Sequence, residues 1–590
     1  MRSGVLEEAK GVLRERFGFE GFLDGQERIV GEILEGRDGL AVMPTGGGKS
    51  LCYQLPGLVK EGVTLVVSPL IALMKDQVDA LEAKGVAVGL VNSTQSWEKQ
   101  QEVLRGVREE EVKLLYVAPE RFRSGSFMRA LEGVKIGMLA IDEAHCLSQW
   151  GHDFRPDYMR LGEARRRLGH PQCVAFTATA TPVVRKDILG VLGLEEPFEV
   201  VTGFARPNLS FQVTPVAKKA EKFRRIREVV GEFKTGIVYC ATRKRVEEVS
   251  EVMASWGLKV AAYHGGMTDE ERERVQDDFL SRRADVAVAT NAFGMGIDRS
   301  DVRFVVHFEV PGSVEAYYQE AGRAGRDGEA GWCELLWNFA DTRTQEFFIE
   351  GVNPGPALVR DLHAVLRREA DGRGEVFRSL DELRDELEVS NGMAVGSALS
   401  LLSRSGAIER FDVPGQRIRG TRLRGDGLEL DEVAMEEKEQ RDREKLDAVV
   451  AFCEGSGCRQ EWILEYFGEE GEDCGTCDVC RSGRASERRE LTEGETLVVR
   501  KALSGVARMS ERVDGRWEAR FGRGKIVQML SGSQSEGILK AGLNRLTTYG
   551  LLREEGTAFL NELFPALGEA GLVQTVRRGD YPLMTLTERG

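Results

Sequence analysis

The stretch Gly39-Leu-Ala-Val-Met43-Pro-Thr45-Gly-Gly-Gly-Lys49-Ser50 carries the strongest structural signal in this chain of 590 residues. The apolar run from Gly39 to Met43 is typical of a buried strand, and a helix is expected to begin near Lys49. Glycines at such a junction let backbone N–H groups approach phosphate oxygens, and the helix N-terminus adds positive partial charge. The stretch therefore predicts a phosphate-binding loop. A glycine-rich turn without a ligand is the alternative.

The residues of this loop have separate expected roles. Lys49 would reach the β and γ phosphates of a nucleotide, and the Ser50 hydroxyl would be a ligand of Mg²⁺. Met43 stands where the usual pattern has its first glycine. We expect the nucleotide to be bound by Thr45, Gly46, Gly47, Gly48, Lys49 and Ser50.

A second apolar run, Met138 to Ile141, ends in Asp142-Glu143-Ala-His145. Two adjacent acids that close a buried strand are costly without a cation nearby. Asp142 is placed to hold Mg²⁺, and Glu143 is placed to orient or deprotonate an attacking water. A solvated acid pair at the end of a strand is the alternative.

Two arginines lie three residues apart in Gln319-Glu-Ala-Gly-Arg323-Ala-Gly-Arg326. On a helix this spacing places both side chains on one face. In other phosphate-hydrolysing enzymes an arginine that reaches the γ-phosphate contributes roughly 10³–10⁵ in rate. We expect Arg323 and Arg326 to act in this way. Ordinary surface arginines are the alternative.

Short β-rich runs alternate with charged, helix-like stretches over the first half of the chain. This rhythm is typical of parallel sheets with helices on both faces, and it starts again after about Arg206. We therefore expect two α/β domains in tandem. The first series of strands is expected at 39–43, 64–68, 114–117, 138–141 and 174–177, and the second at 236–240, 260–263, 286–290, 302–308 and 333–337.

Composition and charge exclude several classes of protein. Hydrophobic residues make up 42% and charged residues 30%, so the chain is neither wholly disordered nor a fibre. The net charge of −15 argues against a uniformly basic nucleic-acid coat protein, although residues 481–590 carry 18 basic and 14 acidic residues. No apolar run approaches the ~20 residues that span a bilayer, and Met1 to Lys10 lacks a signal-peptide pattern. We expect a soluble, intracellular protein.

The motifs together resemble superfamily-2 helicases, and several resemble the RecQ family of DNA helicases more closely. The resemblance runs from about residue 10 to residue 345 and is dense in ordered motifs. Its main elements are the N-terminal Leu13-Arg-Glu-Arg-Phe17-Gly-Phe19, the loop Ser148-Gln-Trp150-Gly-His152-Asp-Phe154-Arg155, and the segments Ser68 to Gln77, Tyr263 to Met267 and Ala292 to Asp298.

This resemblance implies further site residues. Gln26 would read the adenine edge and Phe19 would stack near the base, although Leu23 stands where the family usually has an arginine. Gly296 and Asp298 would belong to the nucleotide site. Aromatic side chains stack on bases of any sequence at roughly 1–3 kcal/mol each. The sensor of single-stranded DNA would accordingly be formed by Trp150, His152, Phe154 and Arg155.

Five of the ten cysteines lie between Cys453 and Cys480. Cys474-Gly-Thr-Cys477-Asp-Val-Cys480 holds two C-x-x-C steps, and a fourth thiol lies upstream. Four thiolates suit a tetrahedral structural Zn²⁺; an iron–sulfur cluster is the alternative. Cys453 and Cys458 are rivals for the fourth position, and the resemblance to the RecQ zinc module favours Cys458.

The tail also resembles a family module. Residues 490–590 are similar to the RecQ C-terminal winged helix, whose hairpin would contact phosphates or wedge the duplex junction through Arg577, Arg578 and Tyr581. An ordinary edge hairpin is the alternative. Residues 355–433 interrupt the family's usual order and suggest an extra, winged-helix-like unit. The acidic stretch 426–447 is expected to be a solvated helix face.

The resemblance as a whole implies two RecA-like domains, a helical zinc module and winged-helix domains. Their expected ranges are 1–205, 206–350, 351–433 (inserted unit), 434–484 (zinc module) and 485–590. The implied function is that of an ATP-dependent 3′–5′ DNA helicase in recombination and repair, with ATP, Mg²⁺ and Zn²⁺ as cofactors. Single-stranded DNA and duplex junctions would be its partners, without a membrane. It would act in the cytoplasm, on the nucleoid of a bacterium, or in a eukaryotic nucleus. An RNA helicase and a non-catalytic DNA-binding scaffold are the alternatives.

Overall fold

The computed structural model describes residues 2–151, 155–294, 299–412, 419–425, 427–482, 491–513, 516–578 and 581–590. The chain forms two compact units, which we describe separately. The first unit comprises the chain up to Asn338, Thr344–Leu446 and Ile463–Gly471, and the second comprises Phe339–Arg343, Asp447–Trp462 and Glu472–Gly590. The five domain ranges expected from the sequence stay a prediction.

The first unit begins with a seven-stranded parallel sheet in the order β3-β4-β2-β5-β6-β1-β7. One face packs against α2, α3 and α4, and residues of the opposite face such as Leu40, Leu65 and Leu139 are buried as well. Parallel strands covered on both faces read as continuous apolar runs, which is why the sequence predicts them. The strands are β1 (Gly39–Val42), β2 (Val63–Val67), β3 (Val88–Val91), β4 (Leu114–Val117), β5 (Ile136–Ile141), β6 (Cys173–Thr177) and β7 (Phe198–Val201).

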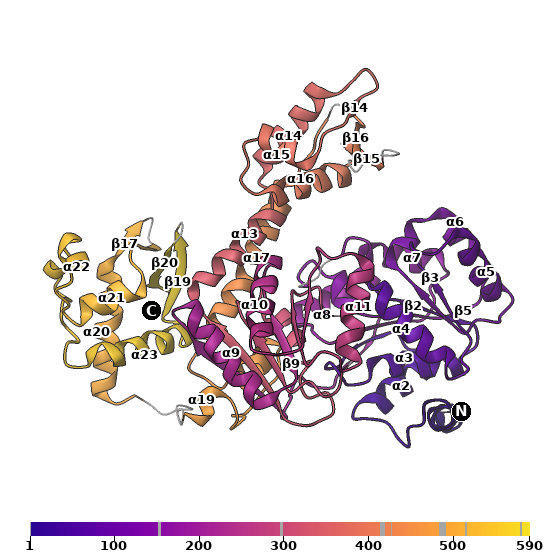
Figure 1. Cartoon of the computed structure of the whole chain (residues 1–590), viewed down its shortest axis with the longest axis horizontal. Helices are drawn as coiled ribbons and strands as arrows, with labels where there is room; N and C mark the ends of the chain where they lie inside the picture. Colours follow the sequence, from indigo (N-terminus) through magenta and orange to yellow (C-terminus); the bar gives the residue numbers. More distant parts are fainter. Residues whose placement is uncertain are drawn as a thin grey trace. The chain divides into compact units, whose positions relative to one another are not determined.

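Helices connect these strands and surround the sheet (Figure 1). They are α1 (Arg2–Val12), α2 (Gln26–Leu34), α3 (Lys49–Val59), α4 (Ile71–Glu82), α5 (Trp97–Arg108), α6 (Gly125–Ala130), α7 (Leu161–Arg167) and α8 (Pro182–Leu192). The strand order places β6 between β5 and β1. The carboxyl ends of these three strands therefore meet at one edge, and the phosphate-loop and Asp142 segments follow from it.

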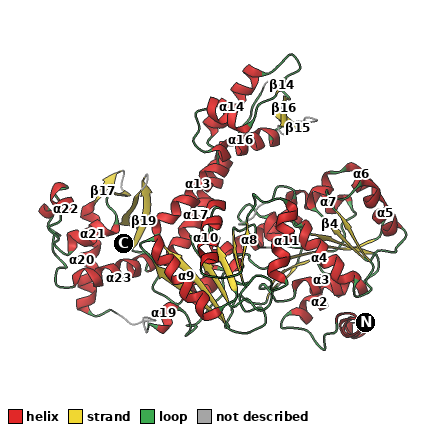
Figure 2. Ribbon diagram, in the orientation of Figure 1, coloured by secondary structure: helices red, strands yellow, loops and turns green. Residues whose placement is uncertain are grey.

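A second parallel sheet has the order β10-β11-β9-β12-β13-β8. Figure 2 shows both sheets between helices. The strands are β8 (Leu209–Pro215), β9 (Gly236–Tyr239), β10 (Val260–Tyr263), β11 (Val286–Ala289), β12 (Phe304–His307) and β13 (Gly331–Trp337), and the helices are α9 (Lys219–Phe233), α10 (Arg243–Ser255), α11 (Asp269–Leu280) and α12 (Val314–Ala321). The expected pair of α/β domains is thus confirmed.

Three strands of the two parallel sheets were absent from the sequence prediction, and all three lie at sheet edges. β8 carries Ser210, Gln212 and Thr214 between its apolar residues, and Glu199 in β7 is exposed. β3 alternates between buried and half-buried positions. An edge strand contacts the core less completely, so its composition is mixed and a search for apolar runs misses it.

The segment after the second sheet folds around a core of its own. Its elements are α13 (Thr342–Val352), α14 (Pro356–Glu369), β14 (Glu375–Val376), α15 (Leu380–Glu386), α16 (Gly392–Arg404), β15 (Ile408–Asp412) and β16 (Arg419–Leu423). The strands pair antiparallel in the order β14-β16-β15. From α14 onward, a helix, a short strand, two helices and a two-stranded hairpin follow one another, which is the order of a winged helix.

Three helices follow this segment in the sequence. α17 (Glu432–Glu454) and α18 (Arg459–Tyr466) are followed by the short α19 (Asp478–Arg481). Asn353, which follows α13, accepts a hydrogen bond from Lys438 Nζ (2.5 Å) and donates one to Asp442 Oδ2 (2.9 Å). These contacts hold α17 beside the end of α13.

The C-terminal part of the second unit repeats the winged-helix order. Its elements are α20 (Glu493–Met509), β17 (Ser510–Val513), β18 (Arg516–Ala519), α21 (Arg523–Leu530), α22 (Glu536–Lys540), α23 (Gly556–Glu569), β19 (Val573–Arg578) and β20 (Tyr581–Leu586). Val506, Ile526, Phe564 and Met584 share its core. In both winged units a left-handed glycine separates helix from hairpin: Gly406 has φ +78° and Gly571 has φ +65°.

No helix in the described part of the chain is long and apolar enough to cross a membrane.

The segment of α14–α16 has a core of its own, so we expect its local stability to be independent of that of the first sheet. Leu402 is fully buried in the core shared by α14, α16 and β15. We expect Leu402→Ala to destabilise this core by about 2–5 kcal/mol, because the side chain leaves a cavity. Hydrogen exchange should then accelerate in α14–α16 while β1 and β6 keep their protection. Ser403→Ala, on the exposed side of the same helix, is the control, and equal acceleration in β1 would contradict the separation.

Candidate functional site

The glycine-rich segment forms a loop between β1 and α3. Gly46 and Gly48 take left-handed conformations, with φ of +84° and +73°, and a Cβ at Gly48 would collide with Gln26 Nε2. Lys49 is the first residue of α3, and its Nζ donates to Met43 O at 3.3 Å. At position 48 only glycine adopts the left-handed conformation without strain and also leaves room for the Gln26 side chain. The loop therefore keeps its backbone open around Lys49.

Asp142 and Glu143 follow β5 directly. Asp142 Oδ1 accepts a hydrogen bond from the Glu143 N–H at 3.0 Å, and Glu143 has the left-handed φ of +48°. Burial and the neighbouring Glu143 carboxylate raise the pKa of Asp142 to about 7, while Lys49 opposes this rise. Burial lowers the pKa of Lys49, against the attraction of Glu143 and Asp142. The structure thus brings the predicted Lys49, Asp142 and Glu143 into one electrostatic group.

Ser50 lies one residue further along α3. Its Oγ accepts a hydrogen bond from Gln77 Nε2 (3.1 Å), and Gln77 Oε1 accepts one from Tyr53 OH (2.9 Å). Oxygen ligands such as the Asp142 carboxylate and the Ser50 hydroxyl suit Mg²⁺. Asp142 is buried and its pKa is raised, so a cation bound there would stabilise the charged carboxylate. These two residues fit the predicted magnesium site.

The two predicted arginines separate. Arg326 lies at the phosphate loop: its Cγ is 3.9 Å from where a Cβ of Gly46 would stand, and its charge lowers the pKa of Lys49. Arg323 is buried inside the second sheet's domain, where it contacts Tyr239. Burial raises the pKa of Tyr239. Arg323 follows the end of α12 while Arg326 lies beyond Gly325, which has a φ of +58°. The helix therefore does not continue, and the expectation of one shared helix face is wrong.

Arg206, which sequence reasoning missed, links the two sheets at this point. Its Nη1 donates to Thr45 O and to Gly322 O, both at 3.2 Å, and its Nη2 donates to Ala324 O at 3.1 Å. The guanidinium thereby joins the phosphate loop to the segment that carries Arg323 and Arg326. The signal in the sequence was only its position at the start of the second strand series.

Gln26 and Leu23 lie beside the loop. Gln26 is buried; its Nε2 donates to Gly47 O (3.1 Å) and Gly48 O (3.3 Å), and its Oε1 accepts from the Leu23 N–H (2.8 Å). Phe19 and Leu23 are 53% and 58% exposed. Stacking of Phe19 on a base and adenine reading by Gln26 both stay predictions. Gly296 and Asp298 lie outside the described residues.

Hydrogen bonds connect the acids of β5 to the predicted DNA loop. Tyr158 OH donates to Asp142 O at 3.2 Å, and His145 Nδ1 lies 3.0 Å from Thr177 Oγ1 at the end of β6. Ser148 Oγ donates to Asp187 Oδ2 at 2.6 Å and accepts from the Trp150 N–H at 3.1 Å. These bonds hold Tyr158 at the end of β5 and hold the segment of Ser148 and Trp150 against α8.

Trp150 itself lies under a cation. The Arg441 guanidinium carbon is 4.6 Å from the centroid of its ring, and Lys445 Nζ donates to Gly151 O at 2.8 Å. Trp150 remains 41% exposed, and Arg155 Nη1 donates to Pro69 O at 3.0 Å. His152 and Phe154 lie outside the described residues.

The contacts of Arg441 and Lys445 correct the expectation for residues 426–447. Burial lowers the pKa of Lys445, so this side of α17 is not solvated. The acidic side chains Glu436, Glu437 and Glu444 are exposed as expected. Charge content identified the solvated side of the helix, but it could not show that two cations on the other side contact a distant loop.

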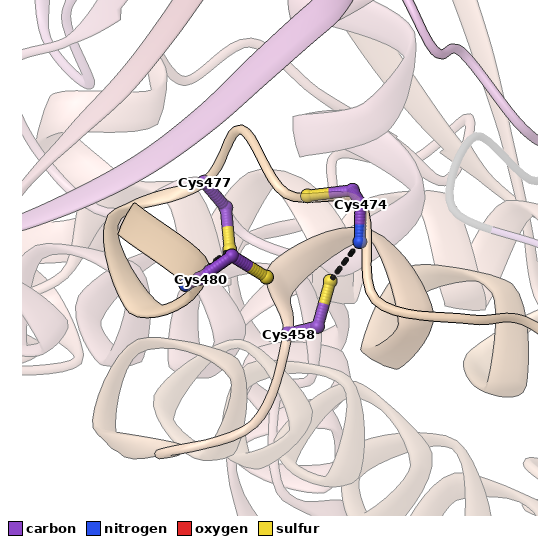
Figure 3. Close-up of side chains that lie close together, drawn as sticks. All are labelled: Cys458, Cys474, Cys477 and Cys480. Atoms are coloured by element: carbon purple, nitrogen blue, oxygen red, sulfur yellow. Dashed lines mark hydrogen bonds between the residues drawn. The ribbon is translucent and has the colours of Figure 1, made fainter. Parts of the chain in front are cut away.

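Four cysteines gather in the second unit (Figure 3). The Sγ atoms of Cys458, Cys474, Cys477 and Cys480 all lie within 4.8 Å of one another, and their side chains point toward one another. The Cys474 N–H donates to Cys458 Sγ at 3.2 Å, and the Cys480 N–H donates to Cys477 Sγ at 3.4 Å. N–H donors stabilise thiolates, and four thiolates fit a structural Zn²⁺ with no open position.

The surroundings of this group settle the choice of the fourth ligand. Cys453 is buried outside the group. Arg459, next to Cys458, forms a two-pronged ion pair with Asp478: Nε and Nη2 lie 3.0 Å from Oδ1 and Oδ2. This pair connects the two ends of the site. Zn²⁺, when bound, would supply cross-linking and no chemistry of its own.

The predicted hairpin residues lie in paired strands. Arg577 is opposite Pro582 and Arg578 is opposite Tyr581 in the antiparallel β19–β20 pair. Their side chains are outside the described part of the structure.

Zinc binding distinguishes the four cysteines from the fifth. We expect Cys480→Ser to lose about one equivalent of bound zinc and to lower the melting temperature, because a structural zinc contributes folding free energy. Elemental analysis of the purified chain measures the metal directly. Cys453→Ser is the matched control and should retain its zinc. Bound iron with visible absorbance would contradict a zinc site.

Four family models match the chain. They are described as DEAD/DEAH box helicase (residues 24–187), helicase conserved C-terminal domain (221–328), RecQ zinc-binding (421–481) and RQC domain (491–590). The two sheets correspond to the first two matches. The four-cysteine group lies within the third, and the C-terminal winged unit within the fourth.

Relatives match over nearly the whole chain. The ATP-dependent DNA helicase RecQ of Bacillus subtilis is 36% identical over 99% of this chain and 83% of its own length. The protein of the same name from Haemophilus influenzae is 34% identical over 99% of this chain and 80% of its own length. The probable ATP-dependent DNA helicase RecS of Bacillus subtilis is 42% identical over 60% of this chain and 72% of its own. From these matches and the zinc and RQC modules, the chain belongs to the RecQ family of helicases.

Proposed function

We propose that the chain is an ATP-dependent DNA helicase that moves 3′ to 5′ on single-stranded DNA and separates duplexes in recombination and repair. The names of its full-length relatives support this activity. The observation that carries the proposal is the position of Arg326 at Gly46, because it brings a cation of the second sheet's domain to the phosphate loop of the first.

The residues of the loop divide the work of ATP hydrolysis. In this reaction a water oxygen bonds to the γ-phosphorus, the bond to the β–γ bridging oxygen breaks, and the water gives up a proton. Glu143 would accept that proton. Lys49 and Arg326 would stabilise the negative charge that spreads over the phosphoryl oxygens. Asp142 and Ser50 would hold Mg²⁺, which neutralises phosphate charge when bound.

Hydrolysis must be coupled to movement, and Arg206 is suited to this. It contacts Thr45 of the phosphate loop as well as Gly322 and Ala324 of the arginine segment. Loss of the γ-phosphate removes the anion that attracts Lys49 and Arg326. The two sheets would then be held by fewer interactions and could separate, as in hinge closure and opening around ligands.

Single-stranded DNA would control this cycle through Trp150. A base that stacks on the exposed ring must share it with Arg441 or displace Arg441 from it. Ser148 accepts from the Trp150 N–H, and the short helix Ala144–Leu147 between Glu143 and Ser148 would carry the change to the acids. We also propose that the chain acts where DNA lies, on the nucleoid of a bacterium or in a eukaryotic nucleus.

Replacement of the proposed base tests the function. We expect single-stranded DNA to stimulate ATP hydrolysis strongly, and Glu143→Gln to lower the stimulated rate by roughly 10²–10⁴, because only proton acceptance is lost. Turnover is measured with DNA, with RNA and without nucleic acid. Glu82→Gln, at the exposed end of α4, is the control and should keep the full rate.

Two results would contradict the proposed function. Stronger stimulation by RNA than by DNA would point to an RNA helicase. Absence of hydrolysis by the unmodified chain while it still binds DNA would point to a scaffold.

The contact between Arg441 and Trp150 predicts a change in DNA sensitivity. Cation–π contacts contribute about 0.5–2 kcal/mol. We expect Arg441→Ala to free the ring and lower the DNA concentration for half-maximal ATP hydrolysis by roughly threefold or more. Arg443→Ala is the control, because Arg443 pairs with Glu439 on the same helix. A higher DNA requirement in Arg441→Ala would instead make Arg441 a phosphate contact.

A further inference from the structure

The winged unit built from α14–α16 and β14–β16 has no assigned role. It lies between the matched ranges 221–328 and 421–481, and only the start of the second overlaps its last strand. Figure 1 shows its three helices grouped with the small sheet. The unit has its own core, so its surface residues can have a function separate from that of the two parallel sheets.

Charge is unevenly distributed in this unit. Residues 371–391, which include α15, carry seven acidic residues and three arginines. Residues 392–424, which include α16 and the hairpin, carry six arginines and two acidic residues. A net positive segment stands out in a chain whose net charge is −15. Clustered cations of this kind are the electrostatic footprint of nucleic-acid binding.

The hairpin presents its arginines on two different faces. Side chains alternate between the two faces along a strand, so residues two positions apart share a face. Ile408 is opposite Leu423, and two positions further on Arg410 is opposite Thr421. Ile408 packs in the core with Leu399 and Leu402 of α16. Arg410 and Arg419 therefore lie on the face that looks toward α16, nearer to the tip of the hairpin.

The arginines of the opposite face are neutralised. Arg422 forms ion pairs with Glu375 (2.6 Å) and Glu409 (3.2 Å), and its guanidinium carbon lies 4.9 Å from the centroid of the Phe411 ring. Arg424 pairs with Glu409 as well. These contacts stabilise the hairpin and leave little charge for a ligand.

Two arginines of the unit, Arg404 at the end of α16 and Arg410 on β15, lack such partners among the described residues. Among the described residues neither Arg404 nor Arg410 has an ion pair, and partial burial lowers the pKa of both. Arg419 lowers the pKa of Arg410 further, because like charges repel. Arg404 ends α16 on its exposed side, together with Ser400 and Ser403. A nearby anion stabilises a partly desolvated cation, and it would also reduce the repulsion between Arg410 and Arg419.

We propose that α16 and the β15–β16 hairpin form a second DNA-binding surface, which holds backbone phosphates of duplex DNA through Arg404 and Arg410. A helix beside a hairpin matches the way recognition helices and strands lie against the grooves of a duplex. Phosphate contacts by arginine position a protein without reading sequence. The choice of DNA as the ligand rests on the proposed function. The surface would hold duplex that the helicase has yet to unwind or has just passed.

Removal of the two unpaired charges tests this surface in the full chain. The probe is a fluorescent, blunt-ended duplex, whose binding is measured by anisotropy at several salt concentrations. We expect Arg404→Gln/Arg410→Gln to weaken binding roughly tenfold at low salt. The slope of log affinity against log salt should fall by about two, because each lost phosphate contact releases fewer counterions.

Matched variants separate a surface from a general charge effect. Arg373→Gln/Arg384→Gln removes the same charge from the acidic side of the same unit and should leave both quantities unchanged. Arg404→Lys/Arg410→Lys keeps the charge and should retain most of the affinity, with an unchanged far-ultraviolet circular dichroism spectrum in all variants.

Three outcomes are decisive. An equal loss of duplex affinity in both glutamine pairs overturns the proposal. Unchanged duplex binding by Arg404→Gln/Arg410→Gln overturns it as well, and an acidic protein would then be the partner to test. ATP hydrolysis stimulated by single-stranded DNA should be the same in all variants. Absence of this ATP hydrolysis in the unmodified chain would refute the proposed function, whereas the comparison of duplex binding among the variants would still test the second surface.

Discussion

Buried charge at the carboxyl edge of the first sheet is the constraint on which the rest of the structure depends. Lys49 and Asp142 lie in an interior that penalises their charged forms: burial lowers the pKa of the first and raises that of the second. Isolated charges in such a place are costly, and a phosphate and a divalent cation relieve both. The left-handed Gly46 and Gly48 keep the backbone open for such an anion. The site is therefore arranged for ligands of opposite charge.

Contacts around this edge make the two sheets respond to one another. Arg206 and Arg326 lie in the chain after the first sheet's last strand, yet both reach the phosphate loop. On the other side, Tyr158 bonds to the backbone of Asp142, and Ser148 bonds to the backbone N–H of Trp150. A ligand at the loop can shift an equilibrium only through differential contacts of this kind.

The segments beyond the sheets add contacts to this core. Between the cysteines of the zinc group, Phe467 stacks on Phe204 at 4.4 Å, and Glu469 Oε2 accepts from the Phe204 N–H at 2.6 Å. Phe204 lies two residues before Arg206. α17 adds Arg441 and Lys445 to the loop of Trp150. The inserted winged unit precedes α17 directly, so the helix that contacts the DNA loop also begins at the end of this unit.

The sequence by itself determined the features that are local. The loop from Gly46 to Ser50, the acids after β5 and the buried strands of both sheets follow from apolar runs, glycines and short spacings. So does the group of Cys474, Cys477 and Cys480, because C-x-x-C steps bring thiols together within a turn.

Only the tertiary structure decided which distant residues meet. Arg326 lies at Gly46 of the loop and Arg323 contacts Tyr239, because the chain turns at Gly325 instead of continuing as a helix. Arg206, Arg441 and Lys445 acquired their roles through hydrogen bonds or ring contacts across more than 150 residues of sequence. The edge strands β3, β7 and β8 gave weak signals, because a strand with one neighbour does not need an apolar run. Local patterns reflect the free energy of short segments, whereas these contacts depend on how sheets and helices pack, which no single segment encodes.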